Sequence, residues 1–242
     1  MSSATYTRFE MLRTFRNVRF MLLSLGFPLV LFFLVAGPNR EKTLGGIPFP
    51  VYYMIGMIAW GTMAAMLSSG ARIATERSVG WNRQLRITPL RTRSYFQAKV
   101  ASAYALAGLS IVLLFLAGVI VGVRLSATEW LTMAGLVLVG LVPFAVLGIL
   151  LGHLLTPESV GPAIGGVTAL LALLGGAYGP IATTGVLSDI VRLLPSYWLV
   201  QAGQVAVGGT PWGVEGWAVV AGWTVVLTRL AASAYRRDTK RV

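Results

Sequence analysis

The sequence predicts an all-α protein that crosses a membrane several times. Of its 242 residues, 56% are hydrophobic and only 12% are charged, and the mean hydropathy is +0.74. A soluble domain of this size needs a far larger charged surface, so a soluble single-domain enzyme is excluded. Stretches free of Asp, Glu, Lys and Arg also recur along the chain, at lengths near the roughly 20 residues that cross the hydrocarbon core of a bilayer.

Six stretches have the length of a transmembrane helix. They lie at about 20–38, 51–70, 100–123, 130–152, 160–180 and 212–234. The second begins near Val51, because the Gly45–Pro50 segment, with its two glycines and two prolines, does not form a regular helix. Pro143 predicts a kink in the fourth. No small-residue cleavage site follows the first apolar run, so we expect that run to stay in the membrane.

Positive charge predicts the orientation of the chain. There are 20 Lys and Arg residues against 8 Asp and Glu, a net charge of +12. With six spans and both termini in the cytoplasm, 16 of the 20 cations face the cytoplasm, in agreement with the positive-inside rule. A further apolar stretch, Leu193–Val207, is short for a crossing, and counting it as a span would remove most of that asymmetry. We therefore expect the segment at about 182–209 to be re-entrant or interfacial. Because the cations are dispersed along short stretches beside the bilayer, we expect no nucleic-acid partner.

The sequence lacks the residues that would power or catalyse a reaction. It has no cysteine, and no predicted span has Asp, Glu or Lys at its centre, where ion-coupled transporters place such groups. The one histidine, His153, falls at the end of the fourth span and is expected to cap a helix. Ser110 and His153 lie in no recognisable protease context. Without a P-loop motif the chain is expected to bind no ATP, metal or other cofactor.

The cytoplasmic stretch 72–99 carries the most specific pattern. Arg77 and Gly80 continue the second span as a helix that Gly80 can end. A short helix over Trp81–Ile87 is expected next, and Thr88-Pro89 ends it, because the residue before a proline avoids the α region. A basic loop held against anionic lipid is the alternative explanation.

At these residues the sequence resembles ABC-2 type permeases, the type-2 ABC exporters, and among them the small drug-resistance permeases related to the daunorubicin exporter. The pattern is Glu76-Arg77-x-x-Gly80, Leu85, Thr88-Pro89-Leu90 and Lys99. The resemblance implies that the 72–99 loop forms a coupling helix in a cleft of a separate ATPase subunit, which binds ATP and Mg. The residues that it assigns to this coupling are Glu76, Arg77, Gly80, Leu85, Arg86, Thr88, Pro89 and Leu90. It also implies a second permease chain, in a homodimer or a heterodimer.

An amphipathic helix is predicted over residues 5–19. Met11, Phe15 and Val18 share one side of it, with Arg13 and Arg16 roughly opposite. Such a helix lies in the membrane interface with its cations toward the lipid headgroups. In the family that the chain resembles, this element is the connecting helix.

Two further patterns each have two explanations. Tyr53, Met57, Trp60 and Ala64 share a face of the second span, either for packing between spans or as the lining of an apolar route for substrate. The glycines of the fifth span and the Gly148-x-x-x-Gly152 motif favour close helix approach. That approach would serve a dimer seam, a moving gate or ordinary packing.

The function expected from the sequence is a multi-pass permease subunit of an ATP-driven exporter in the cell membrane. Its substrate would be a lipophilic drug, as in multidrug or antibiotic efflux, or a lipid. A membrane scaffold or assembly protein without transport is the alternative from another class. A polysaccharide or glycolipid exporter of the same fold also remains open. A lipid-modifying enzyme is disfavoured, because the acids, bases and metal ligands that it needs are missing from the spans.

Overall fold

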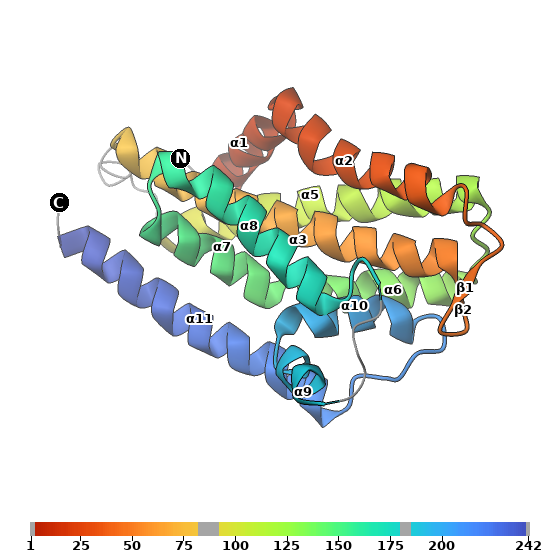
Figure 1. Cartoon of the computed structure of the whole chain (residues 1–242). Helices are drawn as coiled ribbons and strands as arrows, with labels where there is room; N and C mark the ends of the chain where they lie inside the picture. The colour runs from red at the N-terminus through yellow and green to blue at the C-terminus, as the bar shows by residue number, and fades with distance from the viewer. Residues whose placement is uncertain (1–2, 82–91, 180–184, 241–242) are drawn as a thin grey trace.

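The computed structural model describes residues 3–81, 92–179 and 185–240, and within them it confirms an all-α membrane protein. The helices are α1 (Ser3–Arg16), α2 (Val18–Ala36), α3 (Phe49–Ser78), α5 (Thr92–Val121), α6 (Ala127–Gly140), α7 (Val142–Leu154), α8 (Pro157–Gly175), α9 (Val186–Arg192), α10 (Pro195–Val205) and α11 (Val214–Lys240). The two-residue strands β1 (Thr43–Leu44) and β2 (Ile47–Pro48) form a tight antiparallel turn. Both termini lie at one end of the bundle, and this turn lies at the other (Figure 1).

Five stretches of the described residues are long and apolar enough to cross a membrane: α3, α5, α6 together with α7, α8, and α11. The sequence predicted six. The difference is α2, a helix of 19 residues at the first predicted span, in which the described apolar stretch is Ser24–Ala36. Helix α1 ends at Arg16 and α2 begins at Val18, so the amphipathic helix predicted over 5–19 is shorter than expected.

Helix α3 is the centre of the bundle. Within its apolar window 83% of the residues are buried, against 17% for α8 and 22% for α11. It packs against α2, α5, α7 and α8, which surround it in Figure 1. The outer helices consequently present broad apolar faces, which in a membrane protein face lipid or another chain.

Glycines allow α3 and α7 to meet backbone to backbone. A methyl group at Gly70 of α3 would lie 2.2 Å from the carbonyl carbon of Gly148 in α7, and one at Gly152 would lie 2.4 Å from the carbonyl oxygen of Gly70. No larger side chain fits at such distances. The sequence allowed the Gly148-x-x-x-Gly152 motif to lie at a dimer interface. The structure shows that it serves packing within one chain.

Local chemistry explains where the helices end. Helix α3 continues beyond the span limit of residue 70 to Ser78, as the sequence predicted, and Gly80 follows with φ of +72°, a left-handed conformation that residues with a Cβ rarely adopt. The fourth span is two helices, α6 and α7, which separate at Leu141. Pro143, in the first turn of α7, has no N–H to donate to the turn before it, as the predicted kink requires.

The segment predicted to be re-entrant, 182–209, contains the two short helices α9 and α10; its first residues, 182–184, lie outside the described part, as does the end of the fifth predicted span. Helix α10 packs against α6, α8 and α3. Leu199 and Ala202 of α10 are fully buried, and Gly203 lies against Ile55 of α3. This piece is therefore an integral part of the bundle, at the end away from the termini (Figure 1).

Candidate coupling site and transport route

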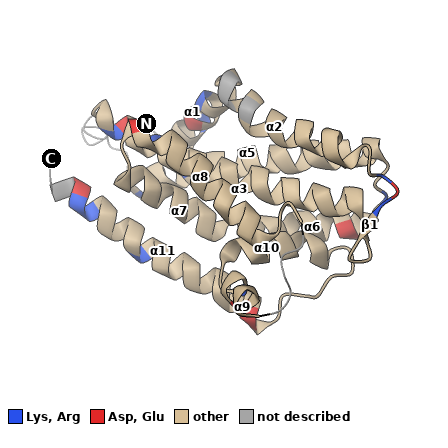
Figure 2. Cartoon of the chain, in the orientation of Figure 1, with Lys and Arg blue, Asp and Glu red and all other residues tan. Residues whose placement is uncertain are grey.

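Acidic and basic residues gather at the two ends of the bundle, with few between them (Figure 2). At the end that carries the termini, α1 crosses α5 and buries a polar stripe. Tyr6, Glu10 and Thr14 recur every fourth residue and are each at most 5% exposed. A helix that lay only on a membrane surface would bury its apolar side instead. Helix α1 is thus bound to the bundle through polar contacts.

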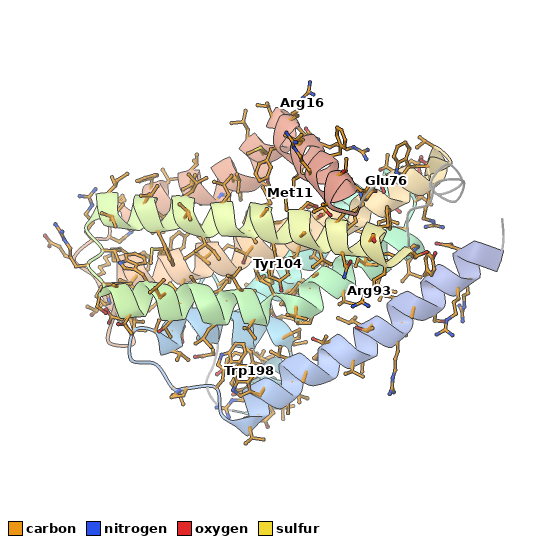
Figure 3. The ribbon with its side chains drawn as sticks, turned by 180° about the vertical axis from the view of Figure 1, so that it is seen from behind. Met11, Arg16, Glu76, Arg93, Tyr104 and Trp198 are labelled. Carbon is orange, nitrogen blue, oxygen red and sulfur yellow. The ribbon has the colours of Figure 1, made fainter. Side chains whose placement is uncertain are left out.

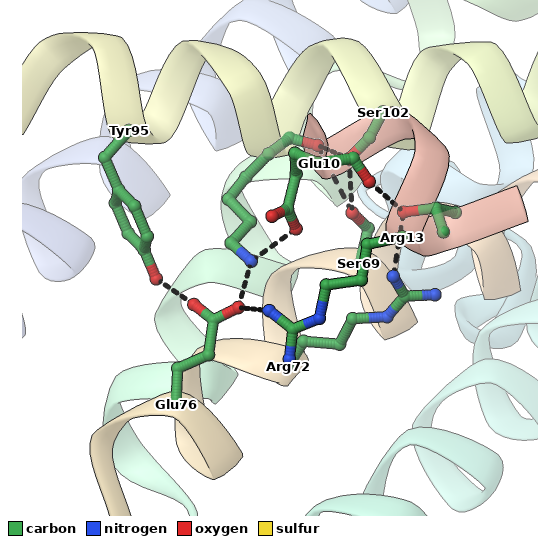
Figure 4. Close-up of polar contacts among 9 residues, drawn as sticks. Glu10, Arg13, Ser69, Arg72, Glu76, Tyr95 and Ser102 are labelled. Carbon is green, nitrogen blue, oxygen red and sulfur yellow. Dashed lines mark hydrogen bonds and ion pairs between the residues drawn. The ribbon is translucent and has the colours of Figure 1, made fainter. Parts of the chain in front are cut away.

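Lys99, in the third turn of α5, is the centre of these contacts. Its side chain is 1% exposed, and its Nζ donates to Glu10 Oε1 of α1 at 2.6 Å and to Glu76 Oε1 of α3. Both carboxylates are buried. The three residues stand far apart in the sequence, yet the Lys99 ammonium group donates to both acids, which are labelled in Figure 4.

Two further donors complete the environment of Glu76. The Tyr95 hydroxyl donates to Oε2 at 2.6 Å, and Arg13 Nη1 donates to Oε1 at 2.9 Å.

Other contacts beside Glu76 also join α1 to the bundle. Arg72 of α3 donates to the Thr14 hydroxyl of α1 at 2.8 Å. Burial, together with the Glu10 and Glu76 carboxylates, raises the pKa of Tyr6 above its ordinary range. This cluster, Glu10–Lys99–Glu76 with Arg13 and Tyr95, ties α1, α3 and α5 together.

A second polar cluster joins α3, α7 and α11 at the same end. Arg77 donates to Asp238 Oδ1 at 2.8 Å and to the carbonyl oxygens of His153 and Gly152 at 2.7 and 3.2 Å. His153 Nδ1 lies 2.7 Å from Asp238 Oδ2. The sequence placed His153 correctly at a helix end, but its side chain is buried and is bonded to the last helix.

Of the predicted coupling residues, the structure describes Glu76, Arg77 and Gly80. The side chains of Glu76 and Arg77 form hydrogen bonds and ion pairs with other helices of the same chain. Leu85, Arg86, Thr88, Pro89 and Leu90 lie outside the described residues. Lys99, which the sequence placed in the same cytoplasmic pattern, is buried. A role for Glu76 and Arg77 in coupling therefore has to act through the placement of the end of α3. In the described residues no group of three or more His, Cys, Asp or Glu is positioned to hold a metal ion.

The residues predicted to form one amphipathic helix belong to two helices, α1 and α2. Met11 and Phe15 are half-buried, whereas Arg13 and Arg16 are exposed, and Arg16 points away from the bundle in Figure 3. Val18, predicted on the same apolar side, is the first residue of α2 and is 60% exposed. The sequence missed the buried stripe of Tyr6, Glu10 and Thr14, although their regular spacing of four was visible in it.

The four residues predicted to line the substrate route differ in how exposed they are. Met57 is fully buried and Tyr53 is nearly so, so core packing accounts for both. Trp60 and Ala64 remain partly exposed on α3, and the Trp60 ring lies 5.2 Å from that of Phe27 in α2. The accessible part of the predicted face is therefore its second half, beside α2.

Long apolar helices whose charged residues lie mostly near their ends define a multi-pass membrane protein. The chain belongs to the ABC-2 transporter family: the family model described as ABC-2 family transporter protein matches residues 36–233. It is also 31% identical over 207 residues to "Putative transport permease YvfS" of Bacillus subtilis (strain 168), with 84% of each chain covered. Membership makes the protein a transport permease subunit and implies an ABC ATPase as its partner.

Proposed function

We propose that the protein is a six-span permease subunit that exports a lipophilic substrate, driven by a separate ATPase that docks on the loop within 72–99. The continuity of α3 supports this most directly. It is one helix of 30 residues, about 45 Å long, with Trp60 and Ala64 in its middle and Glu76 and Arg77 at its end. No proline interrupts it beyond its first turn. A displacement of the loop is thereby transmitted to the proposed route.

Further features support the topology of the proposal. Helix α2 supplies the first span, and both termini lie at the end of the bundle where α3 ends and α5 begins (Figure 1), which the positive-inside rule assigns to the cytoplasm. Helix α1 lies at the membrane interface on that side. Gly161 and Gly165 of α8 have no other atoms within reach of a methyl group, so this face suits close approach of a second permease chain.

The chemistry of the accessible face of α3 favours a lipophilic drug or lipid. Trp60 and Ala64 offer apolar surface, and Phe27 of α2 adds an aromatic ring that is 49% exposed. Aromatic surface accepts apolar ligands of several shapes. A polysaccharide would instead need a series of hydrogen-bonding groups along the route.

Docking is tested with the purified permease and its candidate ATPase in lipid. The double variant Leu85→Asp with Arg86→Glu should lose ATPase binding and the stimulation of ATP hydrolysis. Arg124→Glu, an exposed charge reversal at the opposite end of the bundle, is the matched control. If the double variant binds and stimulates the ATPase normally, the docking assignment is wrong. A wild-type permease that binds the ATPase but moves no lipophilic probe would favour a scaffold or a different substrate.

Orientation is tested separately with single cysteines, since the chain has none of its own. Val79→Cys should react with a membrane-impermeant maleimide only after the cells are opened. Glu41→Cys, beside the β1–β2 turn, should react in intact cells. The reverse pattern would overturn the assignment of both termini to the cytoplasm.

A further inference from the structure

The last turns of α11 contact both ends of the segment that separates α3 from α5. At the α3 side, Asp238 Oδ1 accepts a hydrogen bond from Arg77 at 2.8 Å, two residues before α3 is capped at Val79. At the α5 side, the Tyr235 hydroxyl donates to Thr92 Oγ1 at 3.3 Å, and Thr92 is the first residue of α5. The end of α11 therefore contacts both the last turn of α3 and the first residue of α5. We call these two positions the roots of the predicted coupling loop.

Packing makes these contacts specific. The Tyr235 ring lies edge-on to Phe96 of α5, at 5.4 Å between centroids, and to His153 of α7, at 5.7 Å. His153 Nδ1 is hydrogen-bonded to the second carboxylate oxygen of Asp238, so each of the two oxygens has a hydrogen-bond partner. Asp238 is 21% exposed and Arg77 is 29% exposed, which limits the competition from water for this ion pair.

The other contacts of α11 are mainly with α7. Its apolar window is 22% buried, and toward its end it packs on α7 through Leu227, Ala231 and Ala234 against Leu150. Helix α7 is itself fixed to α3 by their glycine contact. The polar contacts of Tyr235 and Asp238 therefore add direct links from the end of α11 to α3 and α5.

We propose that Asp238 and Tyr235 are positioning residues for ATP-driven transport, forming an α11 clamp that sets the separation of the two roots of the ATPase-docking loop. This rests on the proposed function, because the loop must be the docking element. Both residues lie beyond the stretch 36–233 that matches the family. The competing explanation is that the packing of α3 on α5 alone fixes the roots, in which case the end of α11 has no effect on docking.

The first measurement uses the permease alone. Spin labels at Val79→Cys and Arg93→Cys, both exposed positions beside the roots, report the root separation in nanodiscs. The double variant Asp238→Asn with Tyr235→Phe should shift or broaden this distance distribution, while keeping the tyrosine ring and the volume of the carboxylate. Arg237→Gln, an exposed charge removal in the same turn, should leave it unchanged. An unchanged distribution in the double variant overturns the proposal.

The second measurement adds the partner ATPase. Loss of the clamp should weaken the affinity of the permease for the ATPase about fivefold or more, the effect of one partly buried charge-assisted hydrogen bond. The maximal stimulated rate at saturating permease should stay near that of wild type, which separates positioning from a folding defect. Normal affinity together with a changed root separation also overturns the proposal. Failure of the wild-type permease to bind the ATPase overturns the proposed function instead, and the spin-label result alone then decides whether the clamp exists.

Discussion

Removing Lys99 should destabilise the protein strongly. Lys99→Met deletes two charge-assisted hydrogen bonds and leaves Glu10 buried, without an ion-pair partner among the described residues. Glu76 keeps the Tyr95 hydroxyl and Arg13, but Arg13 is 56% exposed, so that pair contributes about 1 kcal/mol or less. Breaking a buried pair from one side costs about 3–5 kcal/mol. We expect a loss in that range in the free energy of unfolding.

A second substitution tests the electrostatic origin of this loss. Glu10→Gln added to Lys99→Met removes the uncompensated carboxylate, so the double variant should regain about 1–3 kcal/mol relative to the single one. Denaturant unfolding in mixed lipid and detergent micelles, followed by tryptophan fluorescence, measures both values. Arg93→Gln, an exposed charge removal on the same helix, is the control. A loss below about 1 kcal/mol for Lys99→Met, or no recovery in the double variant, would refute the reasoning.

Two further pairs of variants test packing and the proposed route. Gly70→Ala should lower the free energy of unfolding by about 1–3 kcal/mol, because its methyl group meets the backbone of α7. Gly135→Ala, which adds a methyl group in open space on α6, should not lower it; equal effects in denaturant unfolding would argue against the backbone contact. Met57→Ala should cost about 2–5 kcal/mol, because it leaves a cavity in the core. Trp60→Ala should instead reduce transport of a lipophilic probe severalfold in proteoliposomes with little loss of stability, and unimpaired transport would remove Trp60 from the route.

Much of the architecture could be predicted, because it depends on local properties of the chain. Apolar runs predict helices wherever backbone groups must be satisfied without water, and a helix is found at each predicted span. Pro143 and Gly80 act on their own turns, so the break in the fourth span and the end of α3 follow from single residues. The charge asymmetry is likewise a property of the sequence alone.

The polar clusters could not be predicted from the same reasoning. A charged residue near the end of a span is ordinarily solvated, and nothing local to Lys99 shows that Glu10, 89 positions away, lies against it. The same holds for Arg77 and Asp238. The glycine motif of α7 shows a related limit: its spacing predicts close approach, but the partner helix is a property of the tertiary fold.

The backbone contact between α3 and α7 also determines which parts of the molecule are able to slide. Side chains absorb small shear displacements through changes of rotamer, but Gly70, Gly148 and Gly152 have no rotamers to change. Each displacement at this contact would bring peptide groups into collision, so α3 and α7 are expected to behave as one stiff beam. Alternation between inward-open and outward-open states would then be confined to the periphery, where α8 is the least buried of the apolar helices.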